Sequence, residues 1–402
     1  MYLDEKLIFA SGGRSNYRIP SIVADKNGNI YAFCNDRKDG LLDHTDEVAL
    51  VCRRKQLHGD WEPERVLAGV EGWACSMGSA VYDAVTDVVM CSAALIPETR
   101  DEFKAYTKEE AEAIEARATQ KAQEMGICKG PVLLCSADWG NSWQTRPLDV
   151  IPTEHVHWDG TRALIQGSCH GSAHGIQLKH GAYKGRLLCP SRVQIGEYSD
   201  WEGLRKCVYN NAIYSDDHGV TWHASAPVQL ATGEGTLVED GEGKILYNSR
   251  AYFEDQKRYL ATSTDGGATY GDFRTDDFLM EEAYIGCNAS FLRVERQELA
   301  DTQLLPTEAD AITLFANPRS DVREKMTVCY SFDDGKTWAG TKEVYAGPSA
   351  YSSLDFNAAE QRFYLLYEKG TSSPYEYGIA AAVFDLEWLL ESTHCGKQAI
   401  IV

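Results

Sequence analysis

SADWGNSW, at residues 136–143, is the first of four copies of an octapeptide with the pattern Ser-x-Asp-x-Gly-x-Ser/Thr-aromatic. In each copy the Asp can accept hydrogen bonds from nearby N–H groups and hydroxyls, and the Gly supplies a conformation that other residues avoid. The aromatic side chain can pack beneath the turn. We therefore interpret the aspartates as structural and not catalytic. A calcium loop is also excluded, because its Asp ladder and distal Glu are missing. The other copies are SDDHGVTW at 215–222, STDGGATY at 263–270 and SFDDGKTW at 331–338, and the four aspartates are Asp138, Asp217, Asp265 and Asp333.

The sequence around these octapeptides is typical of many short strands separated by turns. The copies are spaced by 79, 48 and 68 residues, which is too irregular for a solenoid but suits repeated four-stranded units with loops of variable length. Turn-forming stretches such as DKNGN at 25–29 and EDGEG at 239–243 separate apolar runs. This pattern predicts an all-β sandwich, barrel or propeller. Strands are expected at 29–34, 48–52, 132–135, 186–189, 244–248 and 362–367.

One segment, TKEEAEAIEARATQKAQEM at 107–125, is instead rich in helix-forming residues. Thr107 and Glu110 match a capping box, and Gly126 is a plausible stop signal. The segment predicts a helix inserted between strands, with Ala111, Ile114 and Ala118 on its apolar stripe. A surface helix packed on the side of the domain, a lid and a subunit contact all stay open.

Composition indicates a globular, acidic protein. The formal net charge of −21 argues against a nucleic-acid-binding surface. The start, MYLDEKLIFASGG, lacks the regions of a signal peptide, and no run of 18 apolar residues exists. We therefore expect a cytoplasmic protein, or a secreted one whose signal peptide is absent from this sequence. The twelve cysteines contain no Cys-x-x-Cys pair, so we expect buried small side chains in a reducing compartment, with disulfides still open.

Outside the octapeptides, ordered motifs resemble those of bacterial sialidases, in which the octapeptide is called the Asp box. Tyr17-Arg18-Ile19-Pro20 is similar to the Arg-Ile-Pro motif near the start of that family. The resemblance extends over most of residues 9–370 and implies an all-β, six-bladed β-propeller with the helix inserted near 107–125. It also implies a single catalytic domain over 1–402. The further matching stretches are NDRKDGLLDHTD (35–46), GIQLKHGAYKGRLLCPSR (175–192), GEGTLVEDGEGKILYNSR (233–250), NPRSDVREKMTVCYSFDDGKTW (317–338), GPSAYSSL (347–354) and LLYEKG (365–370).

The resemblance assigns three arginines, Arg18, Arg250 and Arg323, to the carboxylate of a sialic acid. Guanidinium groups bind carboxylates through paired N–H donors, so the residue type fits this ligand. Arg319 competes for the third position, and Arg323 is favoured because it directly precedes the Glu-Lys-Met-Thr-Val strand. Arg37 resembles the arginine near the 4-hydroxyl of the sugar. Glu368 resembles a glutamate that holds the first arginine in place.

The resemblance also implies Tyr351 as nucleophile, Glu234 as its base and Asp43 as the acid and then base for water. A neutral phenol avoids the repulsion that a carboxylate nucleophile would meet beside the substrate carboxylate. A phenol with a pKa near 10 needs such a base at neutral pH. Asp46 is a nearby alternative to Asp43, because the loop is one residue longer than the family pattern.

These assignments predict an exo-α-sialidase that hydrolyses terminal α-linked sialic acids with retention through a tyrosyl intermediate. Trans-sialidase or intramolecular trans-sialidase activity would use the same residues, and a non-catalytic sialic-acid-binding propeller is a third reading. The expected partners are sialylated glycans or sialosides, with no nucleic acid, no membrane span and no metal or other cofactor. Linkage preference and oligomeric state stay open.

Overall fold

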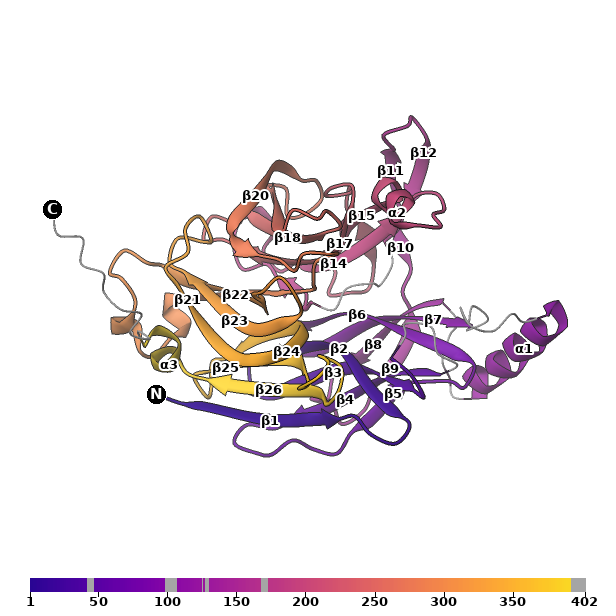
Figure 1. Cartoon of the computed structure of the whole chain (residues 1–402), viewed down its shortest axis with the longest axis horizontal. Coiled ribbons are helices and arrows are strands. Elements are labelled where there is room, and N and C mark those ends of the chain that lie inside the picture. Colours follow the sequence, from indigo (N-terminus) through magenta and orange to yellow (C-terminus); the bar gives the residue numbers. More distant parts are fainter. Residues whose placement is uncertain (42–46, 98–106, 125, 127–129, 168–172, 392–402) are drawn as a thin grey trace.

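The structure is a computed structural model that describes residues 1–41, 47–97, 107–124, 126, 130–167 and 173–391. Over these residues the protein is mostly β-strand, and most strands pair antiparallel with their neighbour in the sequence (Figure 1). The described α-helices are α1 (Lys108–Glu124), α2 (Trp201–Cys207) and α3 (Leu386–Leu390), and the 3-10 helices are η1 (Gly181–Tyr183), η2 (Arg296–Glu298) and η3 (Thr302–Leu304).

The N-terminal half of the chain forms an eight-stranded sheet, a small hairpin and a five-stranded sheet. A parallel bridge between Val48 and Ala74 joins β4 to β6 within the first sheet. The first sheet contains β2 (Ser15–Ala24), β3 (Ile30–Lys38), β4 (Val48–Lys55), β5 (Arg65–Ala68), β6 (Trp73–Asp83), β7 (Val88–Pro97), β8 (Gly130–Ser136) and β9 (Gln144–Pro147). The hairpin is β11 (Thr153–Val156) with β12 (Arg162–Ile165). The next sheet contains β10 (Val150–Ile151), β13 (Ile176–Gln177), β14 (Leu187–Gln194), β15 (Val208–Ser215) and β16 (Trp222–Ala224).

The C-terminal half forms a four-stranded sheet and a seven-stranded sheet. Strand β1 (Leu3–Ala10) belongs to the second of these, because it pairs with β26 (Gly378–Phe384) at the far end of the described chain. The four-stranded sheet contains β17 (Thr232–Glu239), β18 (Ile245–Ala251), β19 (Lys257–Ser263) and β20 (Gly271–Met280). The remaining strands of the seven-stranded sheet are β21 (Ser290–Glu295), β22 (Ala311–Pro318), β23 (Glu324–Ser331), β24 (Gly340–Asn357) and β25 (Arg362–Lys369).

Successive sets of strands pack their apolar faces on one another. Leu133 of β8 and Ile213 of β15 share one cluster, and Ala212 of β15 and Tyr247 of β18 share the next. Ile22 of β2 shares a cluster with Leu366 of β25, so the start and end of the described chain are also packed together. Seven of the described cysteines are buried in such apolar surroundings: Cys34, Cys52, Cys75, Cys91, Cys189, Cys287 and Cys329.

The predicted mostly-β structure and the six predicted strands are confirmed within a few residues. For example, the expected strand at 362–367 is β25, and the one at 48–52 is β4. The predicted helix is α1, and its capping box is formed, since the amide of Glu110 donates to Oγ1 of Thr107 at 3.2 Å and the amide of Thr107 donates to Oε2 of Glu110 at 2.8 Å. Among the described residues, no helix combines the length and apolar composition that crossing a membrane requires.

The four Asp-box turns share one hydrogen-bond pattern, which supports their structural interpretation. In the second copy, Oγ of Ser215 donates to Asp217 at 2.8 Å, and the amide and hydroxyl of Thr221 donate to Asp217 at 2.8 and 2.7 Å. The same bonds occur in the other three copies. Gly219 has a φ of +80° and follows His218 with a φ of +61°, so the turn needs the left-handed conformation twice.

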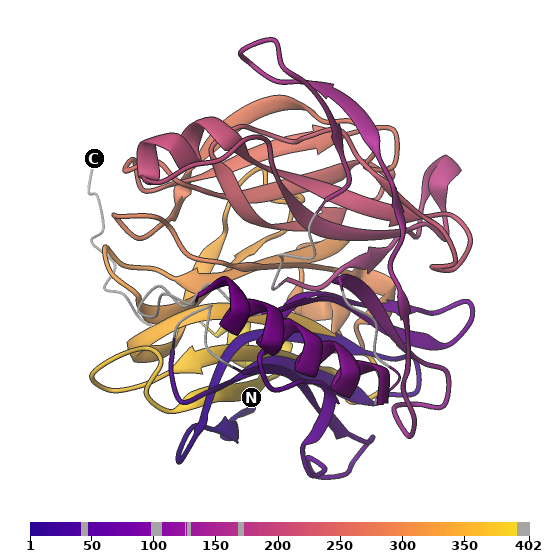
Figure 2. The same cartoon turned by 90° about the vertical axis from the view of Figure 1, so that its right-hand side faces the viewer.

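Helix α1 lies at one edge of the molecule, away from β24 (Figure 1), and Figure 2 views the molecule from this side, with α1 in front. Its buried residues are Ala118 and Ala122, which share a cluster with Trp73 and Leu95 of the first sheet. Gly72 has a φ of +83°, and a side chain there would approach Ile114 to 3.1 Å. The helix therefore packs on the sheet through Ala118 and Ala122, which is the arrangement of a surface helix.

Candidate active site

Tyr351 lies in β24, where this strand leaves β23 and begins to pair with β25. The residue is 8% exposed, and its hydroxyl donates a 2.6 Å hydrogen bond to Oε1 of Glu234 on β17. Nη1 of Arg250, on β18, donates to the Tyr351 hydroxyl at 2.7 Å and to Oε2 of Glu234 at 2.6 Å. A phenol is thus bonded directly to a carboxylate that can accept its proton, and one guanidinium holds both.

The backbone around Glu234 explains why a glycine stands on either side of it. A side chain on Gly233 would lie 2.0 Å from the hydroxyl of Tyr252, and one on Gly235 would lie 2.1 Å from the ring of Tyr247. The pairing of β17 with β18 also shifts register between Thr232 and Gly235. The Gly-Glu-Gly sequence therefore lets two tyrosine rings pack against the strand while Glu234 projects towards Tyr351.

Three guanidinium groups surround the ring of Tyr351. The Cζ atoms of Arg18, Arg250 and Arg323 lie 5.5, 5.9 and 5.6 Å from its centroid. Arg18 and Arg250 are 8% and 5% exposed. Such a concentration of nearly buried positive charge beside a phenol is suited to an anionic ligand, above all to a carboxylate.

Glu368, on β25, ties three segments of the site together. Its Oε1 accepts hydrogen bonds from Nε of Arg18 at 2.5 Å and from the amide of Ile19 at 2.9 Å, and its Oε2 accepts from the amide of Tyr351 at 3.1 Å. Glu368 is fully buried. Ile19 has a φ of +62°, which is unusual for a β-branched residue and needs such support. The contact expected between Glu368 and the first arginine is present.

Arg323 and its alternative, Arg319, point to different surroundings. Nη1 of Arg323 donates to the hydroxyl of Tyr375 at 2.7 Å, and the ring of Tyr375 also lies 3.9 Å from Cζ of Arg18. Arg319 instead donates to the carbonyl of Phe278 at 2.7 Å and stacks on its ring at 4.5 Å. Arg323 is therefore the one that lies beside Tyr351.

Arg37 is 2% exposed and lies on β3, next to the strand that carries Arg18. In the ladder Arg18 is opposite Asn35, and Arg37 is two positions further along β3, so both arginines project from the same face of this strand pair. Asp43 and its alternative Asp46 lie outside the described residues. The structure thus brings together Tyr351 and Glu234 but does not describe the expected acid.

Burial and nearby charges shift the pKa values of Glu234 and Tyr351 in opposite directions. Burial disfavours the charged form of Glu234, but the charge of Arg250 and the hydrogen bond from Tyr351 outweigh it and lower the pKa of Glu234 to about 2. Burial raises the pKa of Tyr351 well above its ordinary value, although the charge of Arg250 opposes this. At neutral pH the pair is a neutral phenol facing a carboxylate.

Two further residues, which the sequence motifs did not single out, border the site. Arg192, on β14, lies with its Cζ 5.9 Å from the ring of Tyr252, and its charge contributes to the lowered pKa of Glu234. Tyr375 contacts two of the three arginines. Arg192 is the last residue of the stretch 175–192 that resembles the sialidase motifs, so the sequence could have indicated it. Nothing in the sequence around Tyr375 indicated its contacts.

Residues 114–362 match the model of the BNR repeat-like domain family, which is more than half of the 402 residues. The chain belongs to the BNR repeat-like domain family. This BNR repeat-like chain is 29% identical over 94% of its length to the sialidase of Micromonospora viridifaciens, and 25% identical over 90% of its length to sialidase-3 of Mus musculus. The solved structure of Hadza microbial sialidase Hz136 matches 93% of the chain with a TM-score of 0.66 and 20% identity, which shows a shared fold.

The BNR repeat-like chain differs in length from some of these proteins. It spans about half (52%) of the Micromonospora sialidase and 66% of the Hz136 chain, but 89% of mouse sialidase-3.

Proposed function

We propose that the protein is an exo-α-sialidase that removes terminal α-linked sialic acids with retention of configuration through a tyrosyl intermediate. The observation that carries this proposal is that Tyr351, Glu234 and Arg250 are hydrogen-bonded to one another. Arg18 and Arg323 also lie beside the Tyr351 ring. The similarity to sialidases from a bacterium and a mammal supports the same function.

The arginines supply the binding step. A sialic acid carries its carboxylate on the anomeric carbon, so guanidinium groups that hold the carboxylate also fix the reacting carbon. Arg18, Arg250 and Arg323 lie at similar distances around Tyr351, and a carboxylate bound among them would place the anomeric carbon close to the phenol oxygen.

In the first chemical step, the Tyr351 oxygen bonds to the anomeric carbon while the bond to the leaving oxygen breaks. The phenolic proton passes to Glu234, and Asp43 gives a proton to the leaving alcohol. In the second step, a water oxygen bonds to the anomeric carbon while the bond from that carbon to the Tyr351 oxygen breaks; Asp43 takes a proton from the water, and Glu234 returns its proton to the Tyr351 oxygen. Two displacements at one carbon give net retention.

We also propose that the chain forms a single domain and that this domain is a six-bladed β-propeller. The strands can be divided into six sets: β2–β5, β6–β9, β13–β16, β17–β20, β21 to the first half of β24, and the second half of β24 with β25, β26 and β1. Six apolar clusters lie between successive sets, and the last of them joins the sixth set to the first. Such closed packing supports a ring of blades, in which β1 completes the last blade.

Proton NMR of the reaction with an aryl α-sialoside tests this function. We expect free sialic acid to form first as the α-anomer, because two displacements retain configuration. The β-anomer as first product would contradict the tyrosyl mechanism. An anhydro sugar or a sialylated acceptor as the main product would show that the protein is a transferase and not a hydrolase. Binding of sialic acid without turnover would show that it is a sialic-acid-binding propeller.

A further inference from the structure

The segment between β20 and β21 contacts two of the three arginines through consecutive carbonyl groups. Nε of Arg250 donates to the carbonyl of Ile285 at 2.9 Å, and Nη2 of Arg323 donates to the carbonyl of Gly286 at 3.0 Å. Neither carbonyl belongs to the residues that the proposed chemistry uses. This short piece of backbone therefore helps to set the direction of both guanidinium groups, together with Glu234 and Tyr351 at Arg250 and with Tyr375 at Arg323.

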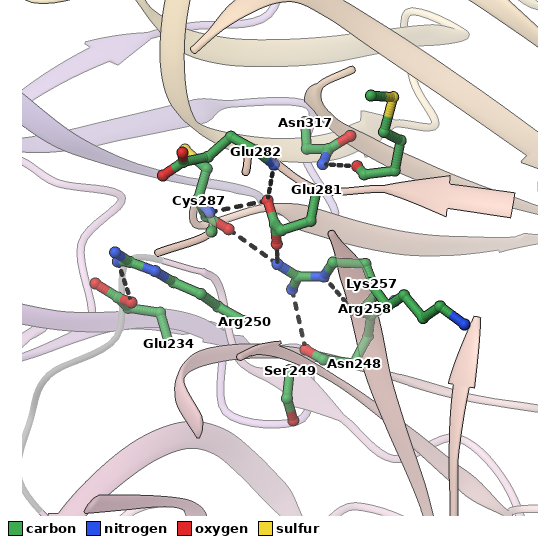
Figure 3. Close-up of polar contacts among 12 residues, drawn as sticks. Glu234, Asn248, Ser249, Arg250, Lys257, Arg258, Glu281, Glu282, Cys287 and Asn317 are labelled. Carbon is green, nitrogen blue, oxygen red and sulfur yellow. Dashed lines mark hydrogen bonds and ion pairs between the residues drawn. The ribbon is translucent and has the colours of Figure 1, made fainter. Parts of the chain in front are cut away.

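The next residue of the segment, Cys287, is held by a buried ion pair. Its amide donates to Oε1 of Glu281 at 2.8 Å, and its carbonyl accepts from Nη1 of Arg258 at 2.9 Å. Arg258 also pairs with Oε2 of Glu281, as Figure 3 shows. Arg258 is fully buried and Glu281 is 2% exposed, so these bonds form without competition from water.

Arg258 also connects the segment to the strand that carries Arg250. Its Nε donates at 2.7 Å to Oδ1 of Asn248, which lies two residues before Arg250 on β18 (Figure 3). The guanidinium of Arg258 thus joins β18 to residues 285–287, whose carbonyl groups contact the site arginines. A lysine has a single terminal charge and cannot reproduce this planar set of bonds.

The packing of Gly286 shows how little freedom the segment has. Its φ is +68°, and a side chain there would lie 3.1 Å from Cγ of Arg250 and 3.2 Å from Cδ of Glu281. The segment lies directly between the ion pair and the site arginine. A small displacement of the ion pair must therefore move the carbonyl groups that the arginines contact.

We propose that Arg258 and Glu281 are positioning residues that set the orientation of Arg250 and Arg323 for the substrate carboxylate. This inference rests on the proposed sialidase function. A buried ion pair gives little net stability compared with apolar side chains of the same volume, so a geometric role accounts for its presence better than a stabilising one. Neither residue contacts the Tyr351 hydroxyl, and both act through residues 285–287.

The test compares Arg258→Lys with a matched control, Arg293→Lys. Arg293 is also a nearly buried, ion-paired arginine, with its side chain 6% exposed, but its partners are Asp334 of an Asp-box turn, 2.7 Å from Nε, and Glu295, 3.5 Å from Nη1. Thermal unfolding, the Kd of free sialic acid by calorimetry, and KM and kcat for a fluorogenic aryl α-sialoside are measured for both variants and the wild type at 25 °C.

We expect both variants to fold and Arg293→Lys to keep the wild-type Kd and KM. Arg258→Lys should raise the Kd and KM by about 10- to 100-fold, because displaced arginines misplace the carboxylate. Equal Kd and KM for Arg258→Lys and the wild type would overturn the proposal.

If Arg258→Lys does not fold, Glu281→Gln is measured in its place, and an unchanged Kd and KM overturn the proposal equally. A wild type that neither binds nor hydrolyses sialosides would instead refute the proposed function, so the two failures are distinguishable.

Discussion

Glu234 is proposed to accept a proton from Tyr351, although its surroundings favour its charged form. A carboxylate with a pKa of about 2 is ionised at neutral pH but is a weak base towards a phenol. Arg250 contributes most to keeping it charged, and Arg250 is also proposed to bind the substrate carboxylate. A bound carboxylate would offset part of that positive charge, so the affinity of Glu234 for the Tyr351 proton rises when substrate is present.

The lowered pKa of Glu234 predicts a specific dependence of stability on pH. Its pKa in the folded protein, about 2, lies below its ordinary value, so ionisation contributes stability that is fully present above the ordinary pKa. That contribution is lost as the pH falls from near the ordinary value towards 2. The free energy of unfolding of the wild type minus that of Glu234→Gln, measured by urea denaturation, should therefore be constant at neutral pH and decrease in acid. A difference that grows on acidification would show that the pKa is raised instead.

The sequence could predict the residues of the site that lie inside recognisable motifs, but not those joined only by folding. Tyr351, Glu234 and the three arginines were predicted to act together, and the structure brings them within one site, although their roles stay proposals. Tyr375 was missed because its contacts to Arg18 and Arg323 join segments that are far apart in the sequence. Contacts of this kind leave no local pattern.

At the scale of elements, Glu368 connects β25 to β2 and β24. Replacing it with alanine removes the partner of the nearly buried Arg18 and leaves the amides of Ile19 and Tyr351 without their acceptor. We expect Glu368→Ala to destabilise the protein by about 3–5 kcal/mol, the range for breaking a buried ion pair. Urea unfolding measures this loss.

Glu202→Ala is the control for that change, because the Glu202–Lys206 pair on α2 is exposed. It should change the free energy of unfolding by less than about 1 kcal/mol. Equal effects of the two substitutions would contradict the account of how Glu368 holds the site.

Helix α1 packs on the first sheet through one face and exposes the other. Ala122 is fully buried against the first sheet, whereas Ala113 lies on the exposed face of the same helix. Ala122→Glu should destabilise the protein by about 2 kcal/mol or more, because it forces a carboxylate into an apolar contact. Ala113→Glu should have little effect, and both variants should keep the wild-type KM, because α1 lies away from β24 (Figure 1). A raised KM for Ala122→Glu would support the lid interpretation that the sequence left open.

Elements whose local sequence contains a clear pattern were predicted, and elements without such a pattern were not. The helix at 107–125 carries its own capping box, which the structure confirms in α1. Helices α2 and α3 have only seven and five residues, too short for a periodic pattern to stand out from the surrounding strands. Asp200 and Asp385 cap their first turns. A single aspartate occurs at many other positions in the sequence, so it does not by itself predict the start of a helix.

At the scale of the whole molecule, the net charge of −21 and the binding of an anion are compatible. Charges separated by more than about 10 Å are largely screened at physiological salt. Distant surface carboxylates therefore do not prevent the three arginines around Tyr351 from binding an anion. The proposed number of six strand sets could not be predicted from the four Asp boxes, because two of the proposed sets carry no copy of the octapeptide.

The proposed closure by β1 predicts that the N-terminal strand stabilises the entire molecule. Phe9 is fully buried in a cluster with residues of β2 and β26, whereas Leu7 is 40% exposed. Phe9→Ala should lower the free energy of unfolding by about 3–5 kcal/mol while unfolding stays a single transition. Leu7→Ala should change it by no more than about 0.5 kcal/mol. A separate early transition in Phe9→Ala would show that β1 is an appendage and not part of a closed ring.

We propose that Tyr351 is the nucleophile of a sialidase. The most direct test of this role is the hydrolysis of a fluorogenic aryl α-sialoside by the wild type, by Tyr351→Phe and by Tyr82→Phe, a control whose hydroxyl bonds Asp87 outside the site. We predict turnover by the wild type and by Tyr82→Phe, and a loss of at least about 100-fold in kcat/KM for Tyr351→Phe, because the attacking oxygen is gone. Turnover by Tyr351→Phe equal to that of the wild type would show that Tyr351 is not the nucleophile.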